Sequence, residues 1–205
     1  MGTNYKSIRE HLRDGDIALF RGRGVLGRLY KYTHVEVVKW NRDMCGAPKS
    51  VMLAGFREFQ GARMVTLSSQ VRKYPGRIDI YRPRCDADTR WWAAELMARQ
   101  SGKKYSWWTI AIAFLWHCTL LRAITGWKPG PDDSDIEPDK WSAWKVCSSS
   151  AVWVFRRWMG KRRISEWPCR TLPTWRCYPQ SIADDAAFFE LLYEGLERQE
   201  WIQTA

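Results

Sequence analysis

The order of its segments constrains the fold of this chain more than any other feature, because strand-length segments come first and helix-length segments follow. A short capped helix is predicted at 3–13. Five short apolar or alternating runs, separated by turn residues, lie at 16–20, 34–40, 51–56, 64–67 and 77–81. Successive strands joined by short turns pair antiparallel, because parallel neighbours need a long crossover between them. We therefore predict an α+β fold in which a small antiparallel sheet packs against helices.

The second part of the chain is predicted to be helical. Its helix-length segments lie at 86–102, 107–121, 147–159 and 182–196, and an acidic stretch rich in Pro and Gly at 126–140 is interpreted as a loop or lid. Nothing repeats along the sequence, and 205 residues suit one domain. We predict a single domain over 1–205, with a sheet part at about 13–82 and a helical part at about 86–196.

Composition indicates which partners the chain prefers. Its 14 tryptophans exceed what a core of this size accommodates, so we expect some at interfaces or over a binding groove. The 33 Lys and Arg against 22 Asp and Glu give a net charge of +11, which favours an acidic cell envelope, membrane headgroups or nucleic acid. Nucleic acid is the least expected of these, because the basic residues form no recognisable reader motif.

Cysteine spacing and hydropathy exclude several classes. The 6 cysteines show neither C-x-x-C spacing nor a nearby histidine at zinc-finger spacing, so we expect free thiols and neither a metal nor another cofactor. The first residues lack the apolar core of a signal peptide, so we expect synthesis in the cytoplasm. The apolar segment 107–121 is shorter than the roughly 20 residues of a spanning helix. A buried helix is favoured there, and contact with a membrane surface stays an alternative because lysines and an arginine flank the segment.

Two residues stand out as chemically competent. Cys147 opens a predicted helix, where the helix dipole and free N–H groups favour a thiolate and can hold an oxyanion. His34 opens a predicted strand directly after a loop, a common place for catalytic groups. Each also has an ordinary structural interpretation, as a small buried residue or a core histidine. Together they match the parts of a papain-like site, with the histidine preceding the cysteine in the chain.

Six short motifs carry a resemblance to a known family. They are RDGDIALFRG at 13–22, THVEVVKW at 33–40, GARMVTLSSQV at 61–71, GKKYSWW at 102–108, VCSSSAV at 146–152 and YPQSIA at 178–183. In order and spacing the chain resembles the circularly permuted branch of the NlpC-type papain-like cysteine peptidases and amidases, relatives of lecithin:retinol acyltransferase. The resemblance implies a permuted papain-like fold, Cys147 as nucleophile, His34 as base, and cleavage of amides through a thioester. It also aligns Tyr105 with an aromatic residue that lines the cleft.

The chain departs from this family at the third catalytic position. The family usually has a polar residue, often Glu, on the strand after the histidine strand, and that position falls near Gly55. Where the family has Gly two residues after the histidine, this chain has Glu36, which shares a strand face with His34. If the two strands form a hairpin, Glu36 and Gly55 are cross-strand neighbours, and the carboxylate has moved between strands. Glu36 is thus predicted to orient His34, with Glu58 as the rival and loss of the third residue as the alternative.

These residues predict a thiol hydrolase that cleaves amide bonds in peptidoglycan stem peptides. Backbone N–H groups at the start of the Cys147 helix, including the one at Ser148, would hold the oxyanion. Since no signal peptide is apparent, a phage tail or another larger assembly would deliver the enzyme to the envelope. One alternative is a membrane-associated hydrolase or acyltransferase acting on lipid or lipoprotein acyl groups. The other is a degenerate papain-like fold that serves as a structural or binding module.

Overall fold

A computed structural model describes residues 4–22, 31–57, 60–104, 146–170, 172 and 177–196. The predicted apolar segment 107–121, the loop 126–140, Tyr105 and Glu58 all lie outside these residues. Within the described parts, no helix is long and apolar enough to cross a membrane.

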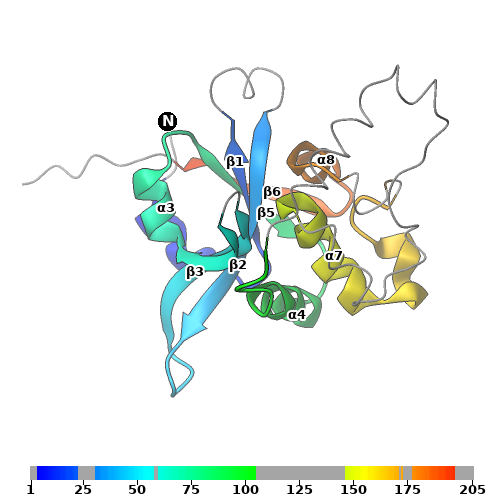
Figure 1. Ribbon diagram of the computed structural model, residues 1–205, viewed down its shortest axis with the longest axis horizontal. Helices are drawn as coiled ribbons and strands as arrows, with labels where there is room; N and C mark the ends of the chain where they lie inside the picture. The colour runs from blue at the N-terminus through cyan, green and yellow to red at the C-terminus, as the bar shows by residue number, and fades with distance from the viewer. Residues whose placement is uncertain are drawn as a thin grey trace, which may run out of the picture.

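A six-stranded sheet, antiparallel throughout, forms the centre of the protein, with the strand order β4-β3-β2-β1-β5-β6 (Figure 1). The strands are β1 (Ile17–Arg21), β2 (Tyr32–Arg42), β3 (Pro48–Arg57), β4 (Gly61–Thr66), β5 (Ile78–Pro83) and β6 (Phe189–Leu196). The predicted α+β class, a small antiparallel sheet packed against helices, is therefore confirmed. All five strands expected in the first 82 residues are present, and β2 and β3 form the expected hairpin.

Helices cover both faces of this sheet. In Figure 1, α3 (Leu67–Lys73) lies on one side, while α4 (Ala87–Ala98), α7 (Cys147–Met159) and α8 (Pro179–Asp184) lie on the other. The described residues add a short N-terminal helix, α1 (Tyr5–Ile8), and two 3-10 helices, η1 (Arg9–His11) and η3 (Lys161–Glu166). The predicted boundaries of α7 are confirmed at both ends.

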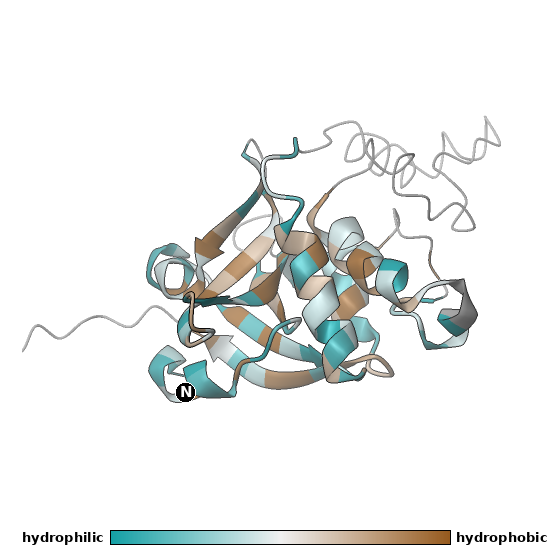
Figure 2. Cartoon of the chain, turned by 90° about the horizontal axis from the view of Figure 1, so that it is seen from below, coloured by the Kyte–Doolittle hydropathy of each residue, from teal (hydrophilic) through white to brown (hydrophobic). Residues whose placement is uncertain are grey.

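Alternation along the strands creates two cores. On β1, Ile17 and Leu19 join the core beneath α4, α7 and α8, whereas Ala18 and Phe20 join the core on the side of α1 and α3. Successive side chains of a strand point to opposite faces, so a strand that is apolar throughout serves both cores. Figure 2 shows the consequence, with hydrophobic segments concentrated in the central strands and hydrophilic turns on the helices.

One predicted element is wrong, and one observed helix was not predicted. The segment 182–196 was expected to be one amphipathic helix, but it divides into the end of α8 and the strand β6. Asp185 follows the end of α8, where its carboxylate accepts hydrogen bonds from the backbone N–H groups of Cys169 and Phe188. β6 pairs with β5, so tertiary pairing overrides a pattern that suited either structure. The helix α3 was not predicted, because Leu67 was assigned to the end of a strand.

Candidate functional site

The nucleophile candidate Cys147 is the first residue of α7. Val146 precedes it in an extended conformation, and the side-chain oxygen of Ser149 accepts a hydrogen bond from the Val146 N–H at 3.2 Å. A serine that turns back onto the entering chain satisfies one of the free donors at a helix start. Cys147 is nearly buried, with 7% of its surface exposed. The helix dipole and the remaining N–H groups of the first turn therefore meet at its sulfur.

The base candidate His34 lies near the start of β2, next to a β-bulge. Phe20 of β1 pairs with His34, but Arg21 pairs with Tyr32, so β2 carries one extra residue, Thr33, at this point. Bulges of this kind re-aim side chains beside functional sites. The imidazole packs against the Phe20 ring, with 5.2 Å between ring centroids, and 22% of the side chain is exposed. Its environment fixes the ring while leaving one part open to solvent.

Glu36 is fully buried and lies beside His34, as the sequence predicts. The His34 Nε2 is 3.3 Å from the Glu36 Oε1. Arg57 of β3 grips the same carboxylate at both oxygens, with Nε 2.5 Å from Oε1 and Nη2 2.7 Å from Oε2. A bidentate guanidinium contact fixes both the charge and the plane of a carboxylate. Arg57 therefore fixes the orientation of the carboxylate, whose Oε1 lies beside His34.

Gly55 makes room for Glu36. β2 and β3 pair Val37 with Ala54, so the next pair along the ladder places Glu36 opposite Gly55. A Cβ atom at position 55 would meet the Glu36 Cγ at 2.9 Å, closer than nonbonded carbons approach. The Glu36 side chain can therefore occupy this place only because residue 55 is a glycine. This agrees with the predicted cross-strand pairing of the two positions.

Cys147 also acts on the protonation of His34, through charge and hydrogen bonding. The Nε2 atom of His34 is buried, and its approach to Glu36 is that of an ion pair without hydrogen-bond geometry. Burial disfavours the charged imidazole, but the Cys147 sulfur and then Glu36 outweigh burial and raise the pKa of His34 from 6.5 to about 10. Burial likewise opposes the charge on Glu36, yet His34 and Arg57 together hold the pKa of Glu36 below its usual value. The arrangement therefore favours an imidazolium at neutral pH, beside the ionised carboxylate of Glu36.

Three further polar residues lie on the elements that carry His34 and Cys147 or next to them. Ser148 is the second residue of α7 and is buried, where its backbone belongs to the first helical turn. Asp16, directly before β1, accepts a hydrogen bond from the Arg13 N–H and pairs with Arg82 through both oxygens. Sequence reasoning missed Arg57. The one signal for it was its position, since in a hairpin register that pairs 36 with 55, residue 57 lies across from His34.

Neither a metal centre nor a disulfide occurs in the parts of the chain that the structure describes. No group of three or more His, Cys, Asp or Glu side chains gathers there as a metal site would require. Cys45, Cys85, Cys147, Cys169 and Cys177 are all free thiols. Compared with known proteins, the chain matches no family model and no curated protein at a significant level.

Proposed function

We propose that this protein is a cysteine amidase or endopeptidase that cleaves peptide bonds in peptidoglycan stem peptides. The single observation that supports this best is the contact of His34 with Cys147 on one side and with the clamped carboxylate of Glu36 on the other. A thiol, an imidazole and an orienting acid, arranged in this order, activate the thiol as a nucleophile.

The proposed reaction proceeds in two steps. The Cys147 sulfur, having given its proton to His34, attacks the amide carbonyl carbon, and the first-turn N–H groups of α7 receive the oxyanion. The C–N bond breaks as the His34 imidazolium protonates the leaving amine, which leaves a thioester on Cys147. His34 then takes a proton from water, the water oxygen attacks the thioester, and the acid product leaves as the thiol is restored.

Glu36 and Arg57 have positioning roles in this mechanism. Glu36, whose Oε1 lies 3.3 Å from Nε2, orients the ring and stabilises the imidazolium by its charge. Arg57 holds Glu36 ionised and in plane inside the protein. A buried carboxylate without such a partner would tend to bind a proton instead. This complete set of partners favours an active enzyme over the degenerate binding module.

The substrate class follows from charge and from the motifs. A net charge of +11 favours approach to an anionic envelope rather than to a neutral one. The six motifs resemble a family that acts on amides of peptidoglycan peptides. Delivery by a phage tail or another assembly belongs to the same proposal.

The first experiment compares the reactivity of two cysteines in the intact chain. Iodoacetamide at pH 6, followed by peptide mass spectrometry, should modify Cys147 faster than Cys45, although Cys45 is exposed and Cys147 is nearly buried. An ordinary exposed thiol is almost fully protonated at this pH. The preference should disappear in His34→Ala. Faster labelling of Cys45 in the wild type would count against a poised nucleophile.

The second experiment tests the substrate. Purified peptidoglycan is incubated with the wild type and with Cys147→Ala, and the released amines and soluble fragments are measured. Cys45→Ala is the matched control, because it removes an exposed thiol of the same chain. New amino termini should appear with the wild type and Cys45→Ala only. Release of fatty acids from vesicles in place of amines would favour the lipid-acting alternative.

A further inference from the structure

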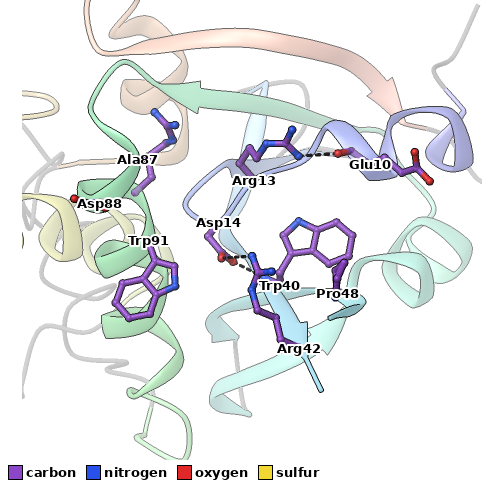
Figure 3. A pocket seen from close by; sticks show the side chains of 10 residues that line it. Glu10, Arg13, Asp14, Trp40, Arg42, Pro48, Ala87, Asp88 and Trp91 are labelled. Carbon is purple, nitrogen blue, oxygen red and sulfur yellow. Dashed lines mark hydrogen bonds and ion pairs between the residues drawn. The ribbon is translucent and has the colours of Figure 1, made fainter. Parts of the chain in front are cut away.

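A cavity lies at the other end of β2 from His34. It has a volume of about 610 Å³ and opens between the end of β2, the first turn of α4 and the residues around η1 (Figure 3). Trp40 of β2 lines it, six residues beyond His34 on the same strand. At about 3.3 Å per residue, the cavity and His34 are roughly 20 Å apart. The cavity is thus separate from the proposed active site, and its volume is that of a small-molecule pocket.

Two indoles and a balanced set of charges line this cavity. Figure 3 shows Trp91 of α4 on one side, with Trp40 and Arg42 of β2 across from it. Trp40 is held in place, because its Nε1 donates to the Leu12 carbonyl at 2.9 Å, whereas Trp91 is 39% exposed. The charged lining residues are three arginines and three acids: Arg13, Arg42, Arg90, Glu10, Asp14 and Asp88. The lining therefore carries no net charge.

Some charged groups of this lining already have partners within the protein, and others are exposed to solvent. Asp14 is nearly buried and is occupied by the Trp40 N–H and by Arg42, whose Nη2 lies 3.6 Å away. Glu10 and Asp88 are exposed carboxylates. The Arg90 Nε is buried and has no hydrogen-bond partner among the described residues. The exposed carboxylates of Glu10 and Asp88 are therefore the lining groups that are open to the hydroxyls of a ligand.

From this chemistry we infer that the cavity binds a neutral sugar unit of a polysaccharide. A pyranose ring presents C–H groups on its faces, which pack on indole rings, and hydroxyls at its edges, which bond to carboxylates and guanidinium groups. A lining without net charge favours this uncharged ligand over a phosphate or another anion. The identity of the sugar as the glycan strand of peptidoglycan rests on the proposed function. On that basis, an extended peptide of about six residues would span from the cavity to Cys147.

The test measures binding without turnover. Cys147→Ala protein is titrated with the tetramer of β-1,4-linked N-acetylglucosamine, and the dissociation constant is measured by calorimetry. Adding Trp91→Ala should weaken binding about tenfold, as expected for loss of an aromatic anchor. The matched control is Trp158→Ala, because Trp158 is 41% exposed on α7 and does not line the cavity. That control should change the dissociation constant less than about twofold.

Each outcome decides the inference separately from the proposed function. The inference is overturned if the wild-type cavity binds no tetramer, if Trp91→Ala and Trp158→Ala weaken binding equally, or if sodium phosphate competes for the site. Asp88→Asn, a second variant that changes only an exposed acid, should also weaken binding if Trp91→Ala alters the fold. Hydrolysis of a sugar-free stem peptide by the enzyme with Cys147 intact tests the proposed function independently, since that substrate cannot occupy the cavity.

Discussion

A single imidazole joins two distant parts of the chain. His34 belongs to the sheet and Cys147 to the helical part, and the sulfur makes the larger contribution to keeping the imidazole protonated. Glu36, two residues along the same strand, makes the smaller one. The charge state of the site therefore depends more on the contact across elements than on the contact within the strand.

The pKa of His34 provides a direct test of whether Cys147 contributes more than Glu36. We expect NMR titration to give a value of about 10 in the wild type, with a large fall in Cys147→Ala and a smaller fall in Glu36→Gln. His11→Gln and His117→Gln assign the remaining signals. A value near 6.5 in the wild type, unchanged by Cys147→Ala, would contradict the interaction.

The raised pKa of His34 also determines how stability and activity depend on pH. Because the folded pKa is raised above 6.5, the stability that protonated His34 contributes is fully present below pH 6.5 and is lost as the pH rises through about 10. Protonation of the leaving amine also needs the imidazolium, so amidase activity should fall over the same alkaline range. An activity that keeps rising above pH 10 would indicate another proton donor.

Arg57 should act through Glu36 rather than on substrate. Arg57→Ala leaves a fully buried carboxylate without its bidentate partner, so we expect a loss of about 3 kcal/mol in the free energy of unfolding. We also expect kcat to fall about tenfold at unchanged KM, with the alkaline limb of the pH profile shifted lower. Urea denaturation and pH-rate profiles measure these effects. Arg57→Lys keeps the charge and should recover part of both, and a variant with reduced stability but an unshifted pH profile would make Arg57 purely structural.

At the level of elements, the register between β2 and β3 determines which strand position can hold the carboxylate that orients His34. Glu36 fits because Gly55 opposite has no side chain. We expect Glu36→Gly and Gly55→Glu to reduce kcat/KM by at least about tenfold each, since one removes the acid and the other places two carboxylates together. The double variant restores one acid and one glycine in exchanged positions, so its activity should exceed that of either single variant. A double variant with the summed losses of the two single variants would show that the strands are not interchangeable.

The sequence predicts the elements around the site better than those at the edge of the sheet. Strand alternation placed His34 and Glu36 on one face of β2. The helix α7 was predicted correctly, from its start at Cys147 to its end before Gly160. β6 was mistaken for a helix because its residues satisfy both periodicities and only the edge of β5 selects the strand. Arg57 was missed because a bidentate ion pair depends on register and rotamer, which a single sequence does not reveal.

Over the whole molecule, the sheet separates two kinds of surface. One end of β2 carries His34, whose protonation depends on Cys147, and the other end carries Trp40, which lines the cavity. A polymeric substrate with a sugar part and a peptide part could contact both ends, whereas a small amide could contact only one. Size of the substrate should therefore affect binding more than it affects the chemical step.

Net charge adds a long-range contribution that a short substrate cannot use. With +11 charges on the chain, attraction to an anionic wall should weaken as salt shortens the Debye length from about 10 Å at 0.1 M to about 3 Å at 1 M. We expect kcat/KM on intact anionic peptidoglycan to fall at least about tenfold over this range, while kcat/KM on a neutral stem peptide changes little. Both rates can be followed by release of amino groups at fixed pH. Equal salt dependence for the two substrates would place the effect in the fold or the active site, because attraction between protein and wall acts only on the polymer.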